Sequence, residues 1–438
     1  MNYKPSGMKA FLIVWFGQVI SLFGSSLTGF ALSIWAWQIT GKATALALVG
    51  FFHFGPTVLL SPIAGALVDR WNRKLVMMFS DLAAGLSTIA ILILYLTGRL
   101  EIWHLYIAGA FSGSFQAFQW PAYSAAISVM LPKEQYTRAS GMISLAESSS
   151  NIAAPIVAAF LLTLIGIQGI LYIDIVTFLF AIGALILVFI PQPPITPEGL
   201  KSRGSLLKES MYGFKYIIKK PSLLGLQLIF FASNLVATFG YTVLSPMILA
   251  RTNNNTITLG SVRSASGLGG TSGGLFLSIW GGPKKRVNGV LLGMILTSLT
   301  GALLMGLGRS IYVWVIASFF SSFFLPLING SNQAIWQSKV PPDIQGKVFA
   351  TRRMIAQITA PVAMLIAGPV ADYVLEPLMS SSNGFSLLFA PIVGMGKGTG
   401  MSLMLVLSGI FGILVGLSGY LIPEVRDVEK IVPDHDSN

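Results

Sequence analysis

The chain contains no cysteine and has few charged residues and few histidines: of its 438 residues, 10% are charged. Without Cys, it cannot form a disulfide, a thiolate metal site or a cysteine nucleophile. His53, His104 and His435 are too scattered to predict a metal site. A soluble domain carries about 25% charged residues, so the low charge excludes most soluble enzymes and binding proteins.

Long apolar runs take the place of these residues, since 54% of the chain is hydrophobic. A membrane-spanning helix needs roughly 20 apolar residues. Twelve such runs cover residues 10–37, 44–68, 75–97, 102–131, 139–166, 169–190, 222–249, 259–280, 287–307, 311–338, 347–375 and 399–422. The sequence therefore predicts an all-α integral membrane protein with twelve transmembrane helices.

The net charge of +12 comes from 28 Lys and Arg against 16 Asp and Glu. Basic residues concentrate in the cytoplasmic loops of membrane proteins. If both termini are cytoplasmic, 22 of the 28 basic residues fall in cytoplasmic segments. We therefore expect a multi-pass protein of the inner (plasma) membrane with both termini in the cytoplasm. The basic excess then reflects membrane topology, and no nucleic acid partner is expected.

A proline-rich and basic stretch at 191–221 separates the runs into two sets of six. Near 204–219 its pattern predicts an amphipathic helix on the membrane surface, with a solvated linker as the alternative. The basic pair Arg73-Lys74 recurs at 285–286, 212 residues later, and such repetition is typical of transporter folds. The predicted parts are an N-terminal half at 1–190, a linker at 191–221, a C-terminal half at 222–423 and a cytoplasmic tail at 424–438.

The loop between the second and third runs reads Gly-Ala-Leu-Val-Asp-Arg-Trp-Asn-Arg-Lys at residues 65–74. It resembles the signature loop of the major facilitator superfamily. That resemblance implies a gating motif made of Gly65, Asp69, Arg70, Arg73 and Lys74. In it, Asp69 docks on the start of span 11 and holds one alternating-access state, since a helix N-terminus favours negative charge. Asn72 stands where the family usually has Gly, and Asn also tolerates positive φ.

Further stretches resemble the macrolide-efflux and siderophore-exporter branch of that superfamily. They are the loop from Trp336 to Phe349, the segment 118–122 with its Pro121, and Asp174 in span 6. The likeness covers nearly the whole chain and implies two pseudo-repeated six-helix halves. Two departures weaken the transfer of a drug/proton antiport mechanism. The span 4 Arg of many antiporters is Ser112 here, and their Gly-Pro motif of span 5 occurs only as Ala154-Pro155.

Ionisable residues inside a bilayer are costly, so each is a functional hypothesis. Glu147 lies in span 5 beside several serines, where a carboxylate can bind and release a proton. The alternative is a static acid held by hydrogen bonds or by an Arg. Asp174 is a second coupling candidate, although its family position favours helix packing. For the remaining span charges we expect that Asp81 pairs with the basic loop at 70–74, that Arg263 snorkels or pairs with an acid, and that Asp372 and Glu376 are solvated.

In the superfamily, spans 1, 4, 7 and 10 line the central cavity. The middles of these runs hold amides, a hydroxyl and aromatic rings: Gln18, Ser21, Gln116, Gln119, Trp120, Asn234, Asn329, Asn332 and Gln333. Neutral amides beside aromatic faces suit an amphipathic ligand, although any single aromatic side chain can equally serve packing or contact lipid. No Lys or Arg lies in these middles, which disfavours a strongly anionic substrate.

These features predict a secondary transporter that exports an amphipathic small molecule, a drug or a macrolide-like or siderophore-like metabolite, in exchange for protons. A lipid or lysolipid transporter of the same fold is the alternative. The expected partners are membrane lipids, the substrate and protons, and the chain is expected to be a monomer without cofactor or metal. No phosphate-binding loop of the Walker type occurs, and catalytic clusters are lacking, so neither ATP drive nor an enzyme is expected.

Overall fold

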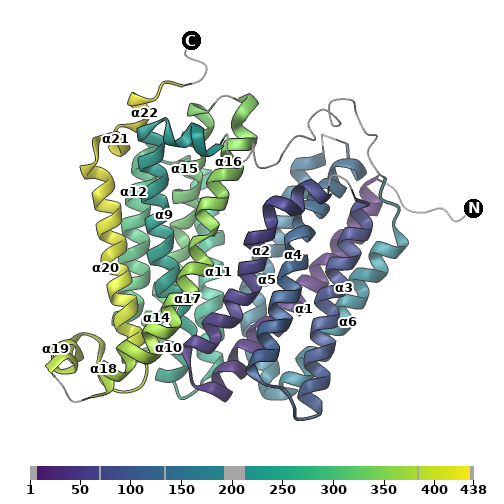
Figure 1. Cartoon of the computed structure of the whole chain (residues 1–438), viewed down its shortest axis with the longest axis horizontal. Helices are drawn as coiled ribbons and strands as arrows, with labels where there is room; N and C mark the ends of the chain where they lie inside the picture. The colour runs from purple at the N-terminus through teal and green to yellow at the C-terminus, as the bar shows by residue number, and fades with distance from the viewer. Residues whose placement is uncertain are drawn as a thin grey trace, which may run out of the picture. The chain divides into compact units, whose positions relative to one another are not determined.

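The computed structural model describes residues 7–68, 71–132, 135–191, 213–340, 342–381 and 384–434. Within these ranges the regular structure is helical and includes no strand (Figure 1). This confirms the predicted all-α class. By its contacts the chain divides into two compact units, which we call unit 1 (Met1–Gly41 and Leu48–Leu200) and unit 2 (Lys42–Ala47 and Lys201–Asn438).

Six long helices build unit 1. They are α1 (Gly7–Thr40), α2 (Ala43–Val68), α3 (Arg73–Leu96), α4 (Ile102–Met130), α5 (Tyr136–Leu164) and α6 (Gly166–Leu187). Helix α1 packs along α6 and α5, and α3 packs against α4 and α6. A single residue, Ile165, joins α5 to α6, and the sharp reversal is possible because Gly166 adopts φ 64°.

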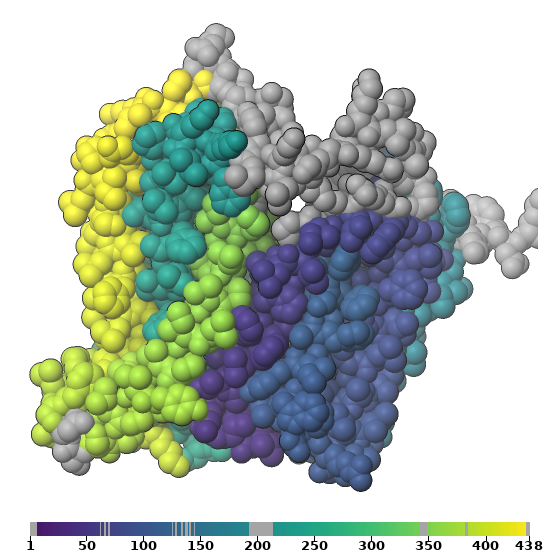
Figure 2. All heavy atoms as spheres, viewed as in Figure 1, coloured from purple at the N-terminus to yellow at the C-terminus, as the bar shows by residue number. Residues whose placement is uncertain are grey.

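The long apolar runs of unit 2 are divided into shorter consecutive helices. The divided runs are α9 (Pro221–Thr242) with α10 (Leu244–Arg251), α12 (Arg286–Thr297) with the π-helical η2 (Ser298–Leu303) and α13 (Leu304–Leu307), and α14 (Ile311–Phe323) with α15 (Leu325–Lys339). A further run holds α16 (Pro342–Gln357), α17 (Thr359–Val370), the π-helical η3 (Ala371–Leu375) and α18 (Glu376–Ser380). The other helices are α11 (Thr256–Trp280), α19 (Gly384–Val393), α20 (Thr399–Leu421), α21 (Pro423–Arg426) and α22 (Val428–Ile431). The breaks at Val243 and Phe324 fall shortly before Pro246 and Pro326, as expected for a residue that lacks an N–H. In Figure 2, α20 (yellow) and α9 (teal) lie side by side on the visible face of this unit.

Ten helical segments among the described residues are long and apolar enough to cross a membrane. Helices α4 and α11, with 29 and 25 residues, are more polar but are also long enough. Even 25 residues extend about 37 Å, against a hydrocarbon core of about 30 Å. Glutamines reduce the hydropathy of α4, and Gly and Ser reduce that of α11. With these two, the twelve predicted spans are accounted for.

Small residues bring α11 and α14 into close contact. Gly269 and Gly273 lie against the backbone carbonyls of Phe319 and Phe323, with no room for a Cβ atom. On the same face of α11, the Val262 carbonyl accepts a hydrogen bond of 2.6 Å from the Ser318 hydroxyl. Close backbone approach through small residues is the usual way in which membrane helices gain packing contacts.

The predicted amphipathic helix near 204–219 lies largely outside the described residues. Of this stretch the structure describes 213–219, and 213–218 are helical. Ile217 in this part is 1% exposed and belongs to the same core cluster as Trp336 and Val348. This piece therefore packs on unit 2.

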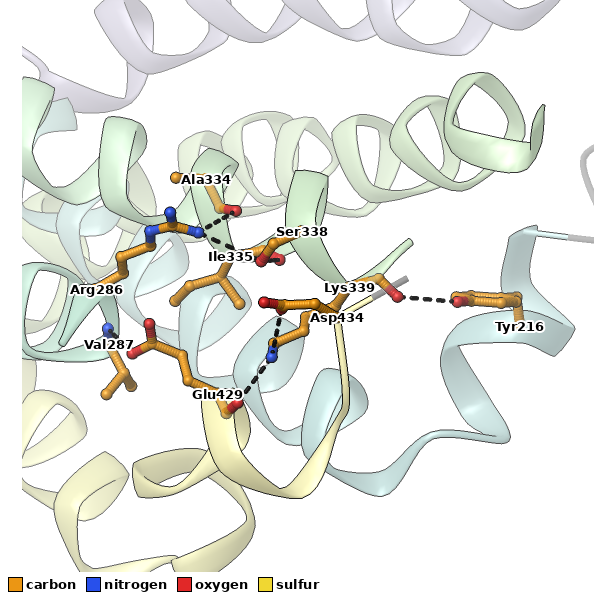
Figure 3. A network of polar contacts seen from close by, with 9 residues as sticks. All are labelled: Tyr216, Arg286, Val287, Ala334, Ile335, Ser338, Lys339, Glu429 and Asp434. Carbon is orange, nitrogen blue, oxygen red and sulfur yellow. Dashed lines mark hydrogen bonds and ion pairs between the residues drawn. The ribbon is translucent and has the colours of Figure 1, made fainter. Parts of the chain in front are cut away.

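The C-terminal tail folds back onto the same end of unit 2 and is held there by Lys339 (Figure 3). Its Nζ donates to the Glu429 carbonyl at 2.7 Å and pairs with Asp434 at 2.8 Å, although the Lys339 side chain is only 4% exposed. The Glu429 carboxylate accepts from the backbone N–H of Val287 at the start of α12, at 3.0 Å. The hydrogen-bonded ion pair with Lys339 is the main cause that holds the pKa of Asp434 below its usual value.

The packing of α11 against α14 predicts opposite outcomes for neighbouring glycines. Gly273→Ala should destabilise the protein by about 2 kcal/mol, because the added methyl overlaps the Phe323 carbonyl and forces the helices apart. Gly274→Ala is the matched control, since no atom lies within 4 Å of its Cβ position. Thermal unfolding in detergent should give a lower midpoint for the first variant only; equal midpoints would contradict the described packing.

The Asp434 pair predicts a tail that loosens in acid. Because the folded-state pKa of Asp434 is lowered, its stabilising effect is complete above the usual carboxyl pKa and is lost as the pH falls through the folded value. The protection factors of residues 423–434, which correct for the slower intrinsic exchange in acid, should therefore fall below about pH 4. Asp434→Asn should show the faster exchange already at pH 7. Unchanged exchange in that variant would exclude the pair as the anchor of the tail.

Candidate functional site

Three polar side chains from three helices of unit 1 meet in one cluster. Asp81 of α3 accepts a hydrogen bond from Gln18 Nε2 of α1 at 2.7 Å, and another from Gln119 Nε2 of α4 at 2.9 Å. Gln119 Nε2 also donates to Gln18 Oε1 at 3.1 Å. All three side chains are partly buried. We call Gln18, Asp81 and Gln119 the carboxylate–amide cluster.

The hydrogen-bond pattern of this cluster is the one expected when Asp81 is ionised. Both carboxylate oxygens accept from amide nitrogens, an arrangement that favours the charged form. A protonated carboxyl group has one O–H donor and needs an acceptor for it. At least one of the two amides must then turn its oxygen toward Asp81 or move away. The proton on Asp81 and the orientation of the amides therefore depend on each other.

Gln119 Oε1 supports this dependence, because it is buried and has no hydrogen-bond partner among the described residues. A buried acceptor without a donor costs about 1–3 kcal/mol. In this arrangement the cluster is one donor short. A proton bound to Asp81 would add a donor to the cluster, and the Gln119 amide would have to turn its oxygen to accept from it.

From the sequence alone, Asp81 was expected to pair with the basic loop at 70–74, and this cluster was not predicted. The partners of Asp81 in the structure are instead two amides that lie 63 and 38 positions away in the chain. Both glutamines had been selected as cavity residues because they are polar in the middles of apolar runs. No sequence pattern showed that the side chain of α3 reaches them.

Asp174, the second coupling candidate, holds three helices of unit 1 together. It lies on α6, is 3% exposed, and accepts from Thr88 of α3 at 2.8 Å and from Ser25 of α1 at 3.1 Å. Gly24 of α1 packs directly against Thr177 in the next turn of α6. These contacts favour the helix-packing interpretation of Asp174.

Glu147, the first coupling candidate, is in the opposite situation. It lies on α5 with an exposed side chain, and no described residue gives its carboxylate a hydrogen bond or an ion pair. Of the neighbouring serines, Ser148 is half-buried, Ser149 is exposed and Ser150 is buried. The carboxylate is therefore not tied to a fixed partner within the described part of unit 1.

The cavity candidates of unit 2 form a second polar group. Arg352 of α16 donates to Gln333 Oε1 of α15 at 3.2 Å, and its guanidinium lies over the Trp336 ring at 5.0 Å and the Phe349 ring at 5.6 Å. Asn332 is only 1% exposed and accepts from Trp336 Nε1 at 3.1 Å. Asn332 thus fixes the indole on which Arg352 stacks.

The remaining cavity candidates differ in exposure, and they do not join these two groups through a described hydrogen bond. Ser21 and Asn234 are half-buried. The exposed candidates are Gln116, Trp120 and Asn329. Trp120 is 44% exposed, which leaves much of its indole surface open to a ligand or to lipid.

The gating motif is described only in part, because Asp69 and Arg70 lie outside the described residues. Gly65 lies in α2, Arg73 begins α3, and Lys74 Nζ donates to the carbonyls of Ile186 and Val188 at the end of α6. Asn72 has φ −68° and accepts from the Leu75 N–H, so its role is that of an N-cap of α3. Asn72 therefore does not use the positive φ that Asn tolerates.

Two acids that were expected to be solvated cap helices instead. Asp372 accepts from the first two backbone N–H groups of α2, at 2.9 and 2.7 Å, in the short segment Lys42–Ala47 that groups with unit 2. Glu376 accepts from Gly398 N at 3.1 Å and Met401 N at 2.8 Å, where α20 begins. The first N–H groups of a helix lack intrahelical partners, and a carboxylate satisfies them best.

These helices and polar groups define a class of protein, a multi-pass α-helical membrane transporter. Residues 14–364 match the family model of the Major Facilitator Superfamily, and the chain belongs to that family. It is therefore a transporter for small substrates and not an enzyme. The matched region contains both candidate polar groups, as well as the gating motif.

Relatives within the family carry names of efflux proteins. Macrolide efflux protein A of Streptococcus pyogenes is 27% identical over 83% of this chain and 89% of its own length. The multidrug efflux pump Tap of Mycolicibacterium fortuitum is 24% identical over 82% and 89%, respectively. Enterobactin exporter EntS of Escherichia coli is 22% identical over 88% and 90%. The predicted efflux branch is thus confirmed.

Solved structures share the fold at low identity. A mutant of peptide transporter POT superposes with a TM-score of 0.70, at 12% identity over 97% of this chain and 95% of that chain. A bacterial homologue of the human lysosomal transporter Spinster gives a TM-score of 0.68, at 14% identity over 94% and 96%. These similarities confirm the fold and carry no information on the substrate.

Proposed function

We propose that the chain exports an amphipathic small molecule in exchange for protons by alternating access. The macrolide, multidrug and enterobactin names of its relatives support the direction of transport and the kind of substrate. Both termini are proposed to face the cytoplasm, from the distribution of basic residues, and the protein is proposed to act as a monomer in the inner membrane. The carboxylate–amide cluster is the observation on which the coupling mechanism rests.

The substrate binds to the amides while Asp81 is ionised. In that state Gln18 Nε2 donates to the carboxylate and Gln18 Oε1 accepts from Gln119, so the second N–H of Gln18 is the donor left for a ligand. Protonation of Asp81 turns an amide and reverses the polarity that the substrate meets. The substrate and the proton therefore exclude each other, which is the thermodynamic requirement for exchange.

Glu147 and the gating motif complete the proposal. Glu147, whose carboxylate is exposed and has no described partner, remains a coupling candidate. Asp69 is proposed to dock on the start of span 11, which is α16, and so to hold one access state. Asp174 is proposed to position α1, α3 and α6 without titrating.

Three carboxylate variants distinguish these roles. In proteoliposomes with an imposed pH gradient, Asp81→Asn should reduce uptake of a radiolabelled macrolide by roughly tenfold or more, since a neutral side chain cannot exchange a proton. Binding of the macrolide to purified Asp81→Asn protein should be weakened, because the neutral side chain imitates protonated Asp81, and it should lose its pH dependence. Asp174→Asn should retain gradient-driven uptake, because its contacts are structural.

Glu147→Gln decides between the two coupling candidates. If Asp81 is the coupling residue, Glu147→Gln slows uptake but keeps the pH dependence of binding. If Glu147→Gln loses that dependence and Asp81→Asn keeps it, the assignment to Asp81 is wrong and Glu147 takes its place. Uptake by the unmodified chain that is the same with and without a gradient would contradict proton exchange altogether.

A lipid or lysolipid transporter is the second candidate, supported by an apolar groove of about 770 Å³ between α1 and α6. Its lining side chains are apolar, and Phe16 and Phe180 are 61% and 62% exposed. Such a surface can hold acyl chains. The same vesicles loaded with fluorescent lysolipid test this candidate: gradient-driven lysolipid movement without macrolide movement would favour it over drug export.

A further inference from the structure

Arg263 is a cation inside a span that the proposed exchange mechanism does not use. It lies on α11, seven residues after Thr256, and is therefore about 10 Å from the end of that helix. Arg263 as a whole residue is exposed, although many atoms of unit 2 surround its guanidinium. A charge at such a depth is costly unless it is compensated, and it marks a functional site by default.

The structure gives Arg263 an orienting contact without neutralising it. One guanidinium nitrogen, Nη2, donates to the Ser245 hydroxyl of α10 at 2.7 Å, and Ser245 is itself buried. No carboxylate among the described residues lies within ion-pair distance of Arg263. The ionisable neighbour that its charge affects is Tyr241 on α9, which is neutral at ordinary pH. A guanidinium has five N–H donors, so most of them remain available.

Arg352, a half-buried arginine of unit 2, shows what a structurally satisfied cation looks like in this chain. Arg352 lies over two aromatic rings, at 5.0 and 5.6 Å, and donates to Gln333. Both aromatic faces and the amide oxygen compensate its charge. Arg263 lacks each of these among its described contacts.

We propose that Arg263 anchors an anionic oxygen group, such as a carboxylate, on the transported amphipathic molecule, an inference that rests on the proposed export function. A guanidinium is suited to this, because its planar fork binds carboxylates and phosphates through two parallel hydrogen bonds. Ser245 holds one edge of the fork and leaves the remaining donors for the ligand.

An anionic group on the substrate is the opposite of what the sequence alone led us to expect. Spans 1, 4, 7 and 10 contain no Lys or Arg in their middles, which disfavoured an anionic substrate. Arg263 lies on the predicted span 8, but its guanidinium reaches Ser245 at the end of span 7. The cation is thus brought to one of the spans that line the cavity by resemblance. The substrate class becomes an amphipathic molecule with an apolar body and one oxyanion.

A matched pair of probes tests the anchor independently of transport. Pyrenebutyrate and its methyl ester share an apolar body and differ in the carboxylate, and their binding to the purified full-length protein can be followed by fluorescence. The unmodified protein should bind the acid roughly tenfold or more tightly than the ester. Arg263→Gln should lose this preference and keep its affinity for the ester, which also shows that it is folded. Arg263→Lys should retain part of the preference.

Arg309→Gln is the control, because the guanidinium of Arg309 donates to the Pro391 carbonyl and should not contribute to the preference. Equal preferences in the unmodified protein and Arg263→Gln would overturn the inference and leave the export proposal intact. Failure of the unmodified protein to bind either probe would instead contradict the amphipathic substrate itself, and the inference with it.

The same oxyanion chemistry could come from a lipid headgroup, and nanodiscs separate the two sources. If the oxyanion belongs to the transported molecule, the acid binds equally in phosphatidylcholine and in phosphatidylglycerol nanodiscs. If phosphatidylglycerol abolishes binding of the acid to the unmodified protein, and Arg263→Gln shows no such difference between the two lipids, the site belongs to an anionic lipid. That result would overturn the proposed role.

Discussion

The structure depends on one constraint: a polar group inside a bilayer has no water to bind and must find its partner in the protein. Each unsatisfied group costs several kcal/mol at that depth. Most charged side chains of the described spans meet this constraint in a static way. Asp174 accepts from hydroxyls of two other helices, Asp372 and Glu376 cap helix ends, and Arg352 stacks on aromatic rings.

Several polar groups meet the constraint only in part, and the function is assigned to two of them. The carboxylate–amide cluster leaves Gln119 Oε1 without a donor, and Arg263 has no described counter-ion. A group that is incompletely satisfied at rest can gain free energy from a proton or a ligand. The proposed exporter uses one such group in each unit, Asp81 for the proton and Arg263 for the oxyanion of the substrate.

The sequence was sufficient for the class, the number of spans and several polar residues, because hydropathy is a local property of the chain. It predicted single spans where α14 and α15 are separate helices, since the effect of Pro326 on the preceding turn is not visible in hydropathy. It predicted Gln18 and Gln119 as cavity residues, but it predicted that Asp81 pairs with the basic loop at 70–74. The contacts of Asp81 join residues 63 and 38 positions apart, and only the packing of α1, α3 and α4 brings them together. Likewise, Asp372 reaches α2 across 329 positions.

The central claim is that substrate binding and protonation of Asp81 exclude each other, and proton counting tests it most directly. Calorimetric titration of the purified protein with its substrate, in buffers of different ionisation enthalpy, gives the number of protons exchanged on binding. If the substrate prefers the ionised form, binding releases protons from the unmodified protein over the pH range in which Asp81 titrates, and no protons are released from Asp81→Asn. Equal proton release from both proteins would contradict the account.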